Sequence, residues 1–335
     1  MSLTTSTTEP YTTLYHREPL HPSRNPPLLV FIPGNPGLID YYTTYLDLIA
    51  KQHRHYEILA ISHAGYQTSD DYEKVSNADF YDLDYQVLHK CRVIRDHILA
   101  TRGDQKVEVS FLCHSVGSYI MQRVAKRLVY DVEYNQIVNI KFVGLICPTI
   151  VDIAKSLLGQ YFTSLFNWLP LVHVAVYLIV VLQWILPDRA AESLIRNRII
   201  AKPAQTDKDL VESWENAVTA TKKIYKSKSI VRQTITMAKE ELNQIHRDDE
   251  FNDWFFKELP TSGAKLWCFF APFDYWVHDN SRDYVLTRYH DALNENVRFE
   301  IGDADTEEKK AINHSFCIDQ SVEFAEITCD ALSKS

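Results

Sequence analysis

Three residues whose types suit nucleophilic catalysis stand along the chain in the order Ser115, Asp274, His314. A serine hydroxyl becomes a useful nucleophile when a neighbouring base takes its proton, and histidine is the commonest such base. A carboxylate can then hold the imidazole in the required tautomer. We therefore predict that Ser115 is a nucleophile, His314 its base and Asp274 the orienting acid.

The segment VEVSFLCHSVGSYIMQRVAKRL predicts a strand, a sharp turn at Ser115 and an amphipathic helix. A nucleophile elbow needs this context, because its strained turn exposes the hydroxyl above a helix N-terminus. The usual pattern is Gly-x-Ser-x-Gly, and Gly117 fills the last position. Cys113 replaces the first glycine and is small enough for strand and helix to approach. His114 precedes the nucleophile and is expected on the opposite side of the strand.

Other residues could compete for the acid and base roles. Asp279 is the best alternative acid, followed by Asp303 or Asp305. His278 is too close to Asp274 in the sequence to replace the late histidine.

An oxyanion hole needs two backbone N–H groups that point at the charge formed in the transition state. Val116, directly after the nucleophile, is expected to supply one. The other should come from the loop Pro33 to Gly37, where Pro36 has no N–H to donate. We expect Asn35 to be this second donor, with Gly34 and Gly37 allowing a close backbone approach.

The elements around these residues predict an α/β fold with a mostly parallel central sheet and helices on both faces. Short, almost continuously apolar runs alternate with helical patterns, as in parallel sheets that are covered on both faces. Helices are expected from Asp40 to His53 and from Asp79 to Thr101, with the two aspartates as N-caps. The six expected strands lie in PLLVFIPG, EILAISHAG, VEVSFLCHS, KFVGLICPT, AKLWCFFAP and NVRFEIG. The order Ser, Asp, His together with these strand-end positions favours the α/β-hydrolase fold.

The alternation stops between residues 151 and 262, where only helical patterns occur. We predict a flexible tail over residues 1–10, a hydrolase core over 11–150 and 263–335, and a helical lid over 151–262. Within the lid, the segment 165–186 (LFNWLPLVHVAVYLIVVLQWIL) has no Asp, Glu, Lys or Arg. Three interpretations stay open for it, namely a buried lid helix, a short membrane span, or a monotopic segment in a phospholipid monolayer.

Composition narrows the classes of function. The 335-residue chain carries a net charge of −9, which argues against nucleic acid as a partner. Its six cysteines show no zinc or redox spacing, so buried free thiols in a reducing compartment are expected. The first ten residues lack the basic and apolar regions of a signal peptide, so we do not expect secretion.

The run IPGNPGLIDYY, the Cys-His-Ser-Val-Gly elbow, Asp274 and the segment Asn-His-Ser-Phe from Asn313 resemble the lipid droplet-associated hydrolase family, a branch of serine α/β-hydrolases. Cys113 departs from the glycine of that family. The resemblance implies hydrolysis of neutral-lipid esters, such as triacylglycerols or sterol esters. The serine mechanism is expected to require no metal or organic cofactor. The resemblance also implies a droplet monolayer or endoplasmic reticulum membrane surface as partner, on the cytosolic side. The alternative is a droplet-surface protein with weak or vestigial catalysis that serves adhesion or remodelling.

Overall fold

The computed structural model describes residues 3–67, 80–203, 207–291, 293–306 and 310–334. Within these residues one eight-stranded sheet has the order β1-β2-β4-β3-β5-β6-β7-β8. The six strands β4, β3, β5, β6, β7 and β8 pair in parallel with their neighbours in this order. The strands β2 and β1 extend the sheet beyond β4 with antiparallel pairings. The strands are β1 (Leu3–Thr5), β2 (Thr13–Arg17), β3 (Leu28–Ile32), β4 (Glu57–Ile61), β5 (Val107–His114), β6 (Val138–Ile146), β7 (Lys265–Phe270) and β8 (Val297–Ile301).

The six predicted strands are β3 to β8, and the expected α/β-hydrolase fold is confirmed. Every residue of β3 and β4 is buried, which explains the unbroken apolar runs over Leu28–Ile32 and residues 58–61. The expectation of a flexible tail over residues 1–10 is wrong for Leu3–Thr5, because this segment pairs with β2.

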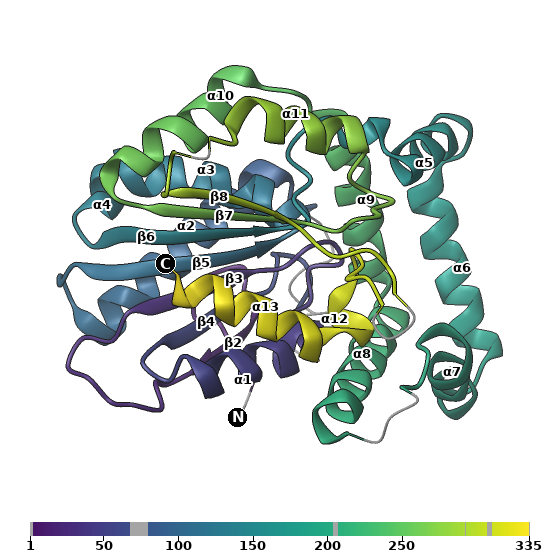
Figure 1. Cartoon of the computed structure of the whole chain (residues 1–335). Helices are drawn as coiled ribbons and strands as arrows, with labels where there is room; N and C mark the ends of the chain where they lie inside the picture. The colour runs from purple at the N-terminus through teal and green to yellow at the C-terminus, as the bar shows by residue number, and fades with distance from the viewer. Residues whose placement is uncertain (1–2, 68–79, 204–206, 292, 307–309, 335) are drawn as a thin grey trace.

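Helices cover both faces of the sheet (Figure 1). The pair α1 and α13 packs together on one face, and α2 packs with α3 on the other. These and the remaining core helices are η1 (Ile39–Tyr42), α1 (Thr43–Gln52), α2 (Leu83–Arg102), α3 (Val116–Tyr130), α4 (Val132–Asn135), α10 (Asp249–Asp253), η4 (Trp254–Glu258), η5 (Leu259–Ser262), α11 (Asp279–Tyr289), α12 (Phe316–Asp319) and α13 (Ser321–Ser333).

Both predicted helix starts need correction. Asp40 lies inside the 3-10 turn η1 and is not an N-cap, since α1 begins only at Thr43. Helix α2 begins at Leu83, where the Asp82 side chain accepts a hydrogen bond from the Tyr85 N–H at 2.7 Å. The predicted cap Asp79 lies outside the described residues.

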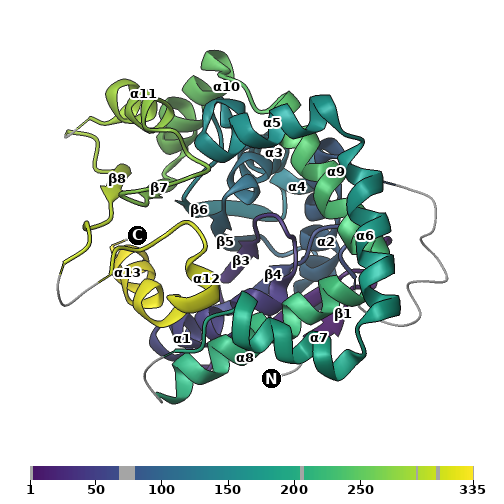
Figure 2. The ribbon, with the colours of Figure 1, turned by 90° about the vertical axis from the view of Figure 1, so that its right-hand side faces the viewer.

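A helical insertion joins β6 to β7, and its described part contains no strand. Figure 2 shows its helices surrounding the edge of the sheet where the parallel strands end. The insertion comprises η2 (Ile153–Lys155), α5 (Leu157–Trp168), α6 (Leu171–Ile185), α7 (Asp188–Leu194), η3 (Ile195–Ile199), α8 (Lys208–Lys226) and α9 (Lys228–Gln244). The apolar segment 165–186 is thus divided between α5 and α6, which meet at an angle of 89°. No residue of α6 is buried, which contradicts the interpretation of this segment as a buried lid helix.

Candidate active site

Ser115 occupies a strained turn between β5 and α3. Its φ of 53° and ψ of −124° lie in a region that residues other than glycine rarely adopt. The turn depends on Gly117, because a Cβ atom there would lie 2.5 Å from the carbonyl oxygen of Pro33 and 2.6 Å from that of Ile32. Cys113 is fully buried in β5, as a small residue at the first elbow position should be. The geometry is that of a nucleophile elbow.

The structure brings Ser115, His314 and Asp274 into one chain of hydrogen bonds. His314 Nε2 lies 2.9 Å from Ser115 Oγ, and His314 Nδ1 lies 2.7 Å from Asp274 Oδ2. The other carboxylate oxygen accepts hydrogen bonds from the backbone N–H groups of Trp276 and Val277. Asp274 is therefore held in place from both sides, as an acid that orients a histidine should be.

The alternative acids do not take part in this chain. Asp279 is exposed and pairs with Arg282 at 3.0 Å. Asp303 and Asp305 are exposed as well, and Asp305 accepts a hydrogen bond from the Ala311 N–H.

The sequence suggested that His114 lies on the opposite side of the strand from Ser115. In the structure, His114 instead lines the same cavity as Ser115. Its Nε2–H donates to the carbonyl oxygen of His314 at 2.8 Å, and its Nδ1 accepts from the Tyr42 hydroxyl at 2.8 Å. Burial lowers the pKa of His114 well below its usual value, so the ring is neutral and suits both bonds. His114 thus holds the backbone of His314.

The two residues expected to form the oxyanion hole have N–H groups without protein acceptors in the described part of the chain. Val116 begins α3, where the first N–H groups have no partner within the helix. The Gly34 N–H donates to the Tyr42 hydroxyl at 3.3 Å, whereas the Asn35 N–H makes no such bond within the described residues. Both Asn35 and Ser115 line the same cavity.

The remaining loop glycines allow close packing. A Cβ atom at Gly37 would meet the His63 ring at 2.5 Å, and one at Gly34 would lie 3.0 Å from His114 Nδ1. These residues shape the loop beside Ser115 and need no chemical role.

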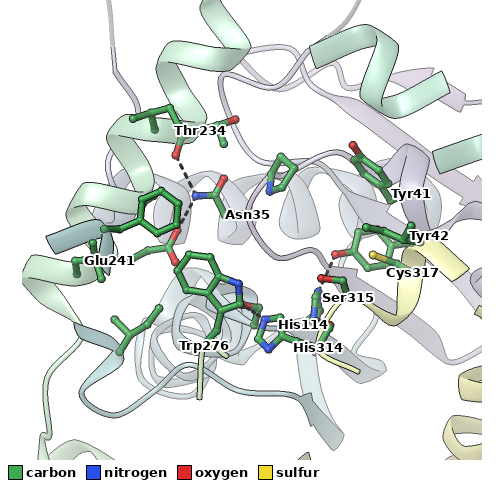
Figure 3. A pocket seen from close by; sticks show the side chains of 18 of the residues that line it. Asn35, Tyr41, Tyr42, His114, Thr234, Glu241, Trp276, His314, Ser315 and Cys317 are labelled. Atoms are coloured by element: carbon green, nitrogen blue, oxygen red, sulfur yellow. Dashed lines mark hydrogen bonds between the residues drawn. The ribbon is translucent and has the colours of Figure 1, made fainter. Parts of the chain in front are cut away.

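A cavity of about 300 Å³, shown in Figure 3, has Ser115 in its wall. This volume lies at the low end of the range for small-molecule sites. Most of its wall is apolar, with contributions from α5, α9 and the loops after β3, β7 and β8. The lining includes Asn35, Tyr41, Tyr42, His114, Ser115, Phe162, Phe166, Thr234, Ile235, Ala238, Glu241, Trp276, His314 and Cys317.

Comparison with known proteins decides the family. A family model described as lipid-droplet associated hydrolase matches residues 25–317. The chain belongs to this family. Membership makes it a hydrolase. The resemblance of the elbow and of the loop from Gly34 to Gly37, here named the GNPG loop, had implied this activity.

Relatives that share the family name cover different amounts of this hydrolase. The lipid droplet-associated hydrolase of Gallus gallus is 25% identical over 92% of this chain and 86% of its own length. The protein of that name from Homo sapiens is 30% identical over 51% of this chain and 52% of its own length. The fold resembles a serine hydrolase from Cycloclasticus zankles, with a TM-score of 0.57 and 15% identity over 99% of this chain and 98% of that one. A 2-hydroxy-6-oxo-6-phenylhexa-2,4-dienoate hydrolase from Rhodococcus gives a TM-score of 0.58 at 10% identity, covering 99% of both chains.

Several cavity residues of the hydrolase were not predicted from sequence. Tyr42 carried a weak signal as part of the family motif, and its partner His114 stands directly before the nucleophile. Phe162, Trp276 and Glu241 had no signal, because helix and loop residues reach the cavity only through the packing of the insertion.

Two groups in the described residues have ligand atoms close enough to hold a metal ion. In the first, His16 and His97 each contact Glu57 at 2.7 Å, but the Arg102 guanidinium also contacts this carboxylate and disfavours a cation. The second joins Cys147 to Asp274 and His314, and burial raises the pKa of the Cys147 thiol well above its usual value. A protonated thiol is a poor ligand. All six cysteines are buried and free, as predicted.

Proposed function

We propose that this protein hydrolyses carboxylic esters of neutral lipids through an acyl-enzyme formed on Ser115. The observation that carries the proposal is the hydrogen-bonded chain of Ser115, His314 and Asp274 at an apolar cavity. A serine at the elbow favours acyl transfer, whereas haloalkane dehalogenases and epoxide hydrolases use a carboxylate there. The family name and the names of the relatives support a lipid ester as substrate.

In the first half of the reaction, Ser115 Oγ attacks the ester carbonyl carbon while its proton passes to His314 Nε2. The N–H groups of Val116 and Asn35 bind the oxyanion of the tetrahedral intermediate. The bond to the alkoxy group then breaks, and the imidazolium gives its proton to the departing alcohol. Asp274 stabilises the imidazolium while it exists.

In the second half, water attacks the acyl-enzyme and gives a proton to His314. The second tetrahedral intermediate collapses, releases the carboxylic acid and returns the proton to Ser115. The cycle consumes one ester and one water and requires no metal or organic cofactor.

We propose further that the protein binds a phospholipid monolayer at a lipid droplet or the cytosolic side of the endoplasmic reticulum membrane. No single described helix is long and apolar enough to cross a membrane, and only the bent pair of α5 and α6 passes by length and composition. A bent pair suits a surface with a single leaflet, because both of its ends return to the same aqueous side. A group of exposed apolar residues, here named the lipid-facing patch, supports this docking. It comprises Trp168, Leu169, Tyr177, Leu178, Val180, Leu182, Trp184 and Ile185.

Helix α5 connects the patch with the cavity. Phe162 and Phe166 line the cavity, and Trp168 at the end of the same helix belongs to the patch. Phe162 also stacks on Trp276, two residues after the catalytic acid, with ring centroids 5.7 Å apart. A lipid ester could therefore enter beside α5 from the lipid, while the cavity encloses one part of it. In this proposal the insertion from η2 to α9 acts as a lid that is also the docking surface, whereas residues 249–262 of the predicted lid pack with the core.

The alternative is a droplet-surface protein with weak or vestigial catalysis, used for droplet adhesion or remodelling. The exposed patch favours it, because docking through α6 does not require Ser115 to react. Purified protein and the Ser115→Ala variant, incubated with short esters, triacylglycerols and sterol esters, distinguish the two. Ester cleavage that depends on Ser115 supports the hydrolase. Equal activity of both proteins, or none above background, contradicts it.

A further inference from the structure

The side chain of Asn35 is held from three directions. Its Oδ1 accepts a hydrogen bond from the Tyr66 hydroxyl at 2.6 Å. Its Nδ2 donates to the carbonyl oxygen of Thr234 at 3.1 Å and to Glu241 Oε1 at 2.9 Å (Figure 3). Thr234 and Glu241 both belong to α9, so the insertion fixes a residue that lies about 200 positions earlier in the chain.

Glu241 makes this contact from a buried position. Its side chain lines the cavity, but only 5% of the residue is exposed. Desolvation raises the pKa of Glu241 to about 8, so the carboxyl group is predominantly neutral at pH 7. A neutral carboxyl group can accept the Asn35 hydrogen bond without leaving an unpaired charge in the protein interior. The bond between α9 and the loop is therefore compatible with its apolar surroundings.

Asn35 also has a part in the proposed reaction, because its backbone N–H is the second donor to the oxyanion. A donor lowers the transition-state energy only if it already points at the developing charge. The side chain and this N–H belong to one residue, so bonds that fix the side chain also limit the orientation of the N–H. Three side-chain hydrogen bonds restrict the rotation of the Asn35 backbone and hence the direction of its N–H.

We infer that Glu241 is a positioning residue for hydrolysis, which holds the Asn35 side chain so that the Asn35 N–H stays directed at the oxyanion. The inference rests on the proposed function. It makes α9 a working part of the active site, and α9 also packs against α6, the helix that carries most of the lipid-facing patch. Displacement of α9 would remove the Glu241 bond and loosen the oxyanion donor.

The test uses the full chain and a short soluble ester, so that lipid docking does not affect the result. Glu241→Leu removes the acceptor at similar volume, and we expect kcat to fall about tenfold or more with KM within about threefold, since loss of one whole donor costs 10²–10³. Glu241→Gln keeps a neutral acceptor and should stay within about threefold of the original protein. Affinity for a trifluoromethyl ketone, which forms an oxyanion on the serine, should fall in proportion to kcat/KM. The matched control is Glu240→Leu, since the neighbouring carboxylate on α9 contacts Leu83 outside the cavity.

Asn35→Ala provides a second variant that does not depend on the folding of Glu241→Leu. It removes all three side-chain bonds but keeps the backbone N–H, and we expect a similar loss of kcat. Adding Glu241→Leu to it should cause little further loss, because both changes break the same contact. Thermal unfolding of each variant shows that the protein tested is folded.

Three results would overturn the inference. These are full kcat in folded Glu241→Leu, full kcat in folded Asn35→Ala, or an equal loss in Glu240→Leu. Failure of the proposed function has a different signature, since turnover would then persist in Ser115→Ala.

Discussion

Polar substitution of two exposed residues on α6 should release the protein from lipid without harming its fold. Trp184 is 87% exposed and Leu178 is 53% exposed, so both side chains already face solvent in the protein alone. Full burial of one large apolar side chain contributes about 1.5–3 kcal/mol. Scaled by these exposed fractions, immersion of the two side chains contributes roughly 2–4 kcal/mol. Their joint replacement by serine should weaken binding roughly 30- to 700-fold, because 1.4 kcal/mol corresponds to a factor of ten.

The assay is flotation with emulsified triacylglycerol coated by a phospholipid monolayer. The fraction of protein that floats should fall in Trp184→Ser/Leu178→Ser, while the turnover of a short soluble ester stays unchanged. Val132→Ser is the control, because Val132 is 69% exposed on α4, at the other end of the molecule in Figure 1. Unchanged flotation would refute the docking proposal. Aggregation of the double variant, or a parallel loss of soluble-ester turnover, would show instead that the patch belongs to the folded core.

Three further predictions concern the active site and the protein interior. Asp274→Asn and His314→Ala should each reduce soluble-ester turnover by several orders of magnitude. Asp279→Asn should keep a turnover close to that of the original protein. A large loss in Asp279→Asn with only a mild loss in Asp274→Asn would show that the acid is wrongly assigned. Glu57→Gln should lower the free energy of unfolding by about 3–5 kcal/mol, because it leaves a buried guanidinium without its partner. Turnover per folded molecule should remain, because Glu57 lies at the start of β4, whereas the site lies where the parallel strands end. Chemical denaturation measures the stability, and active-site titration measures the turnover per folded molecule. Burial raises the pKa of Glu241 from 4.5 to about 8, so the folded state binds the extra proton and stability from this group falls as pH rises through that window. The melting temperature of Glu241→Gln relative to the original protein should therefore rise between pH 5 and 8, and a constant difference would show that Glu241 is not held neutral.

Patterns that depend on neighbouring residues predicted most of the sheet. Runs such as Leu28–Ile32 and residues 58–61 are apolar throughout because both faces of their strands are buried. The elbow was equally local, since Ser115 and Gly117 sit in a single strand-turn-helix segment. The strand Leu3–Thr5 was missed because its Thr-rich sequence has no apolar alternation, although its partners in β2 lie only 8 to 12 residues away.

Contacts between distant segments could not be predicted in this way. The sequence did not show that His114 faces the active site, because its hydrogen-bond partner there is the carbonyl group of His314, 200 residues later. Glu241 stands on an amphipathic helix like many surface glutamates, and only the docking of α9 over the GNPG loop buries it against Asn35. The prediction of a helix start at Asp40 was wrong because the chain first forms a 3-10 turn there. Whether a 3-10 turn or an α-helix forms at such a position depends on tertiary packing.

The most direct measurement of the central claim is covalent labelling by a fluorophosphonate, followed by mass spectrometry of the labelled peptide. An activated serine attacks phosphorus and displaces fluoride, whereas an ordinary surface serine does not react at a comparable rate. We predict one stoichiometric label on Ser115, abolished in Ser115→Ala and greatly slowed in His314→Ala. Absence of labelling in folded protein, or labelling that persists in Ser115→Ala, would contradict the assignment of Ser115 as the nucleophile.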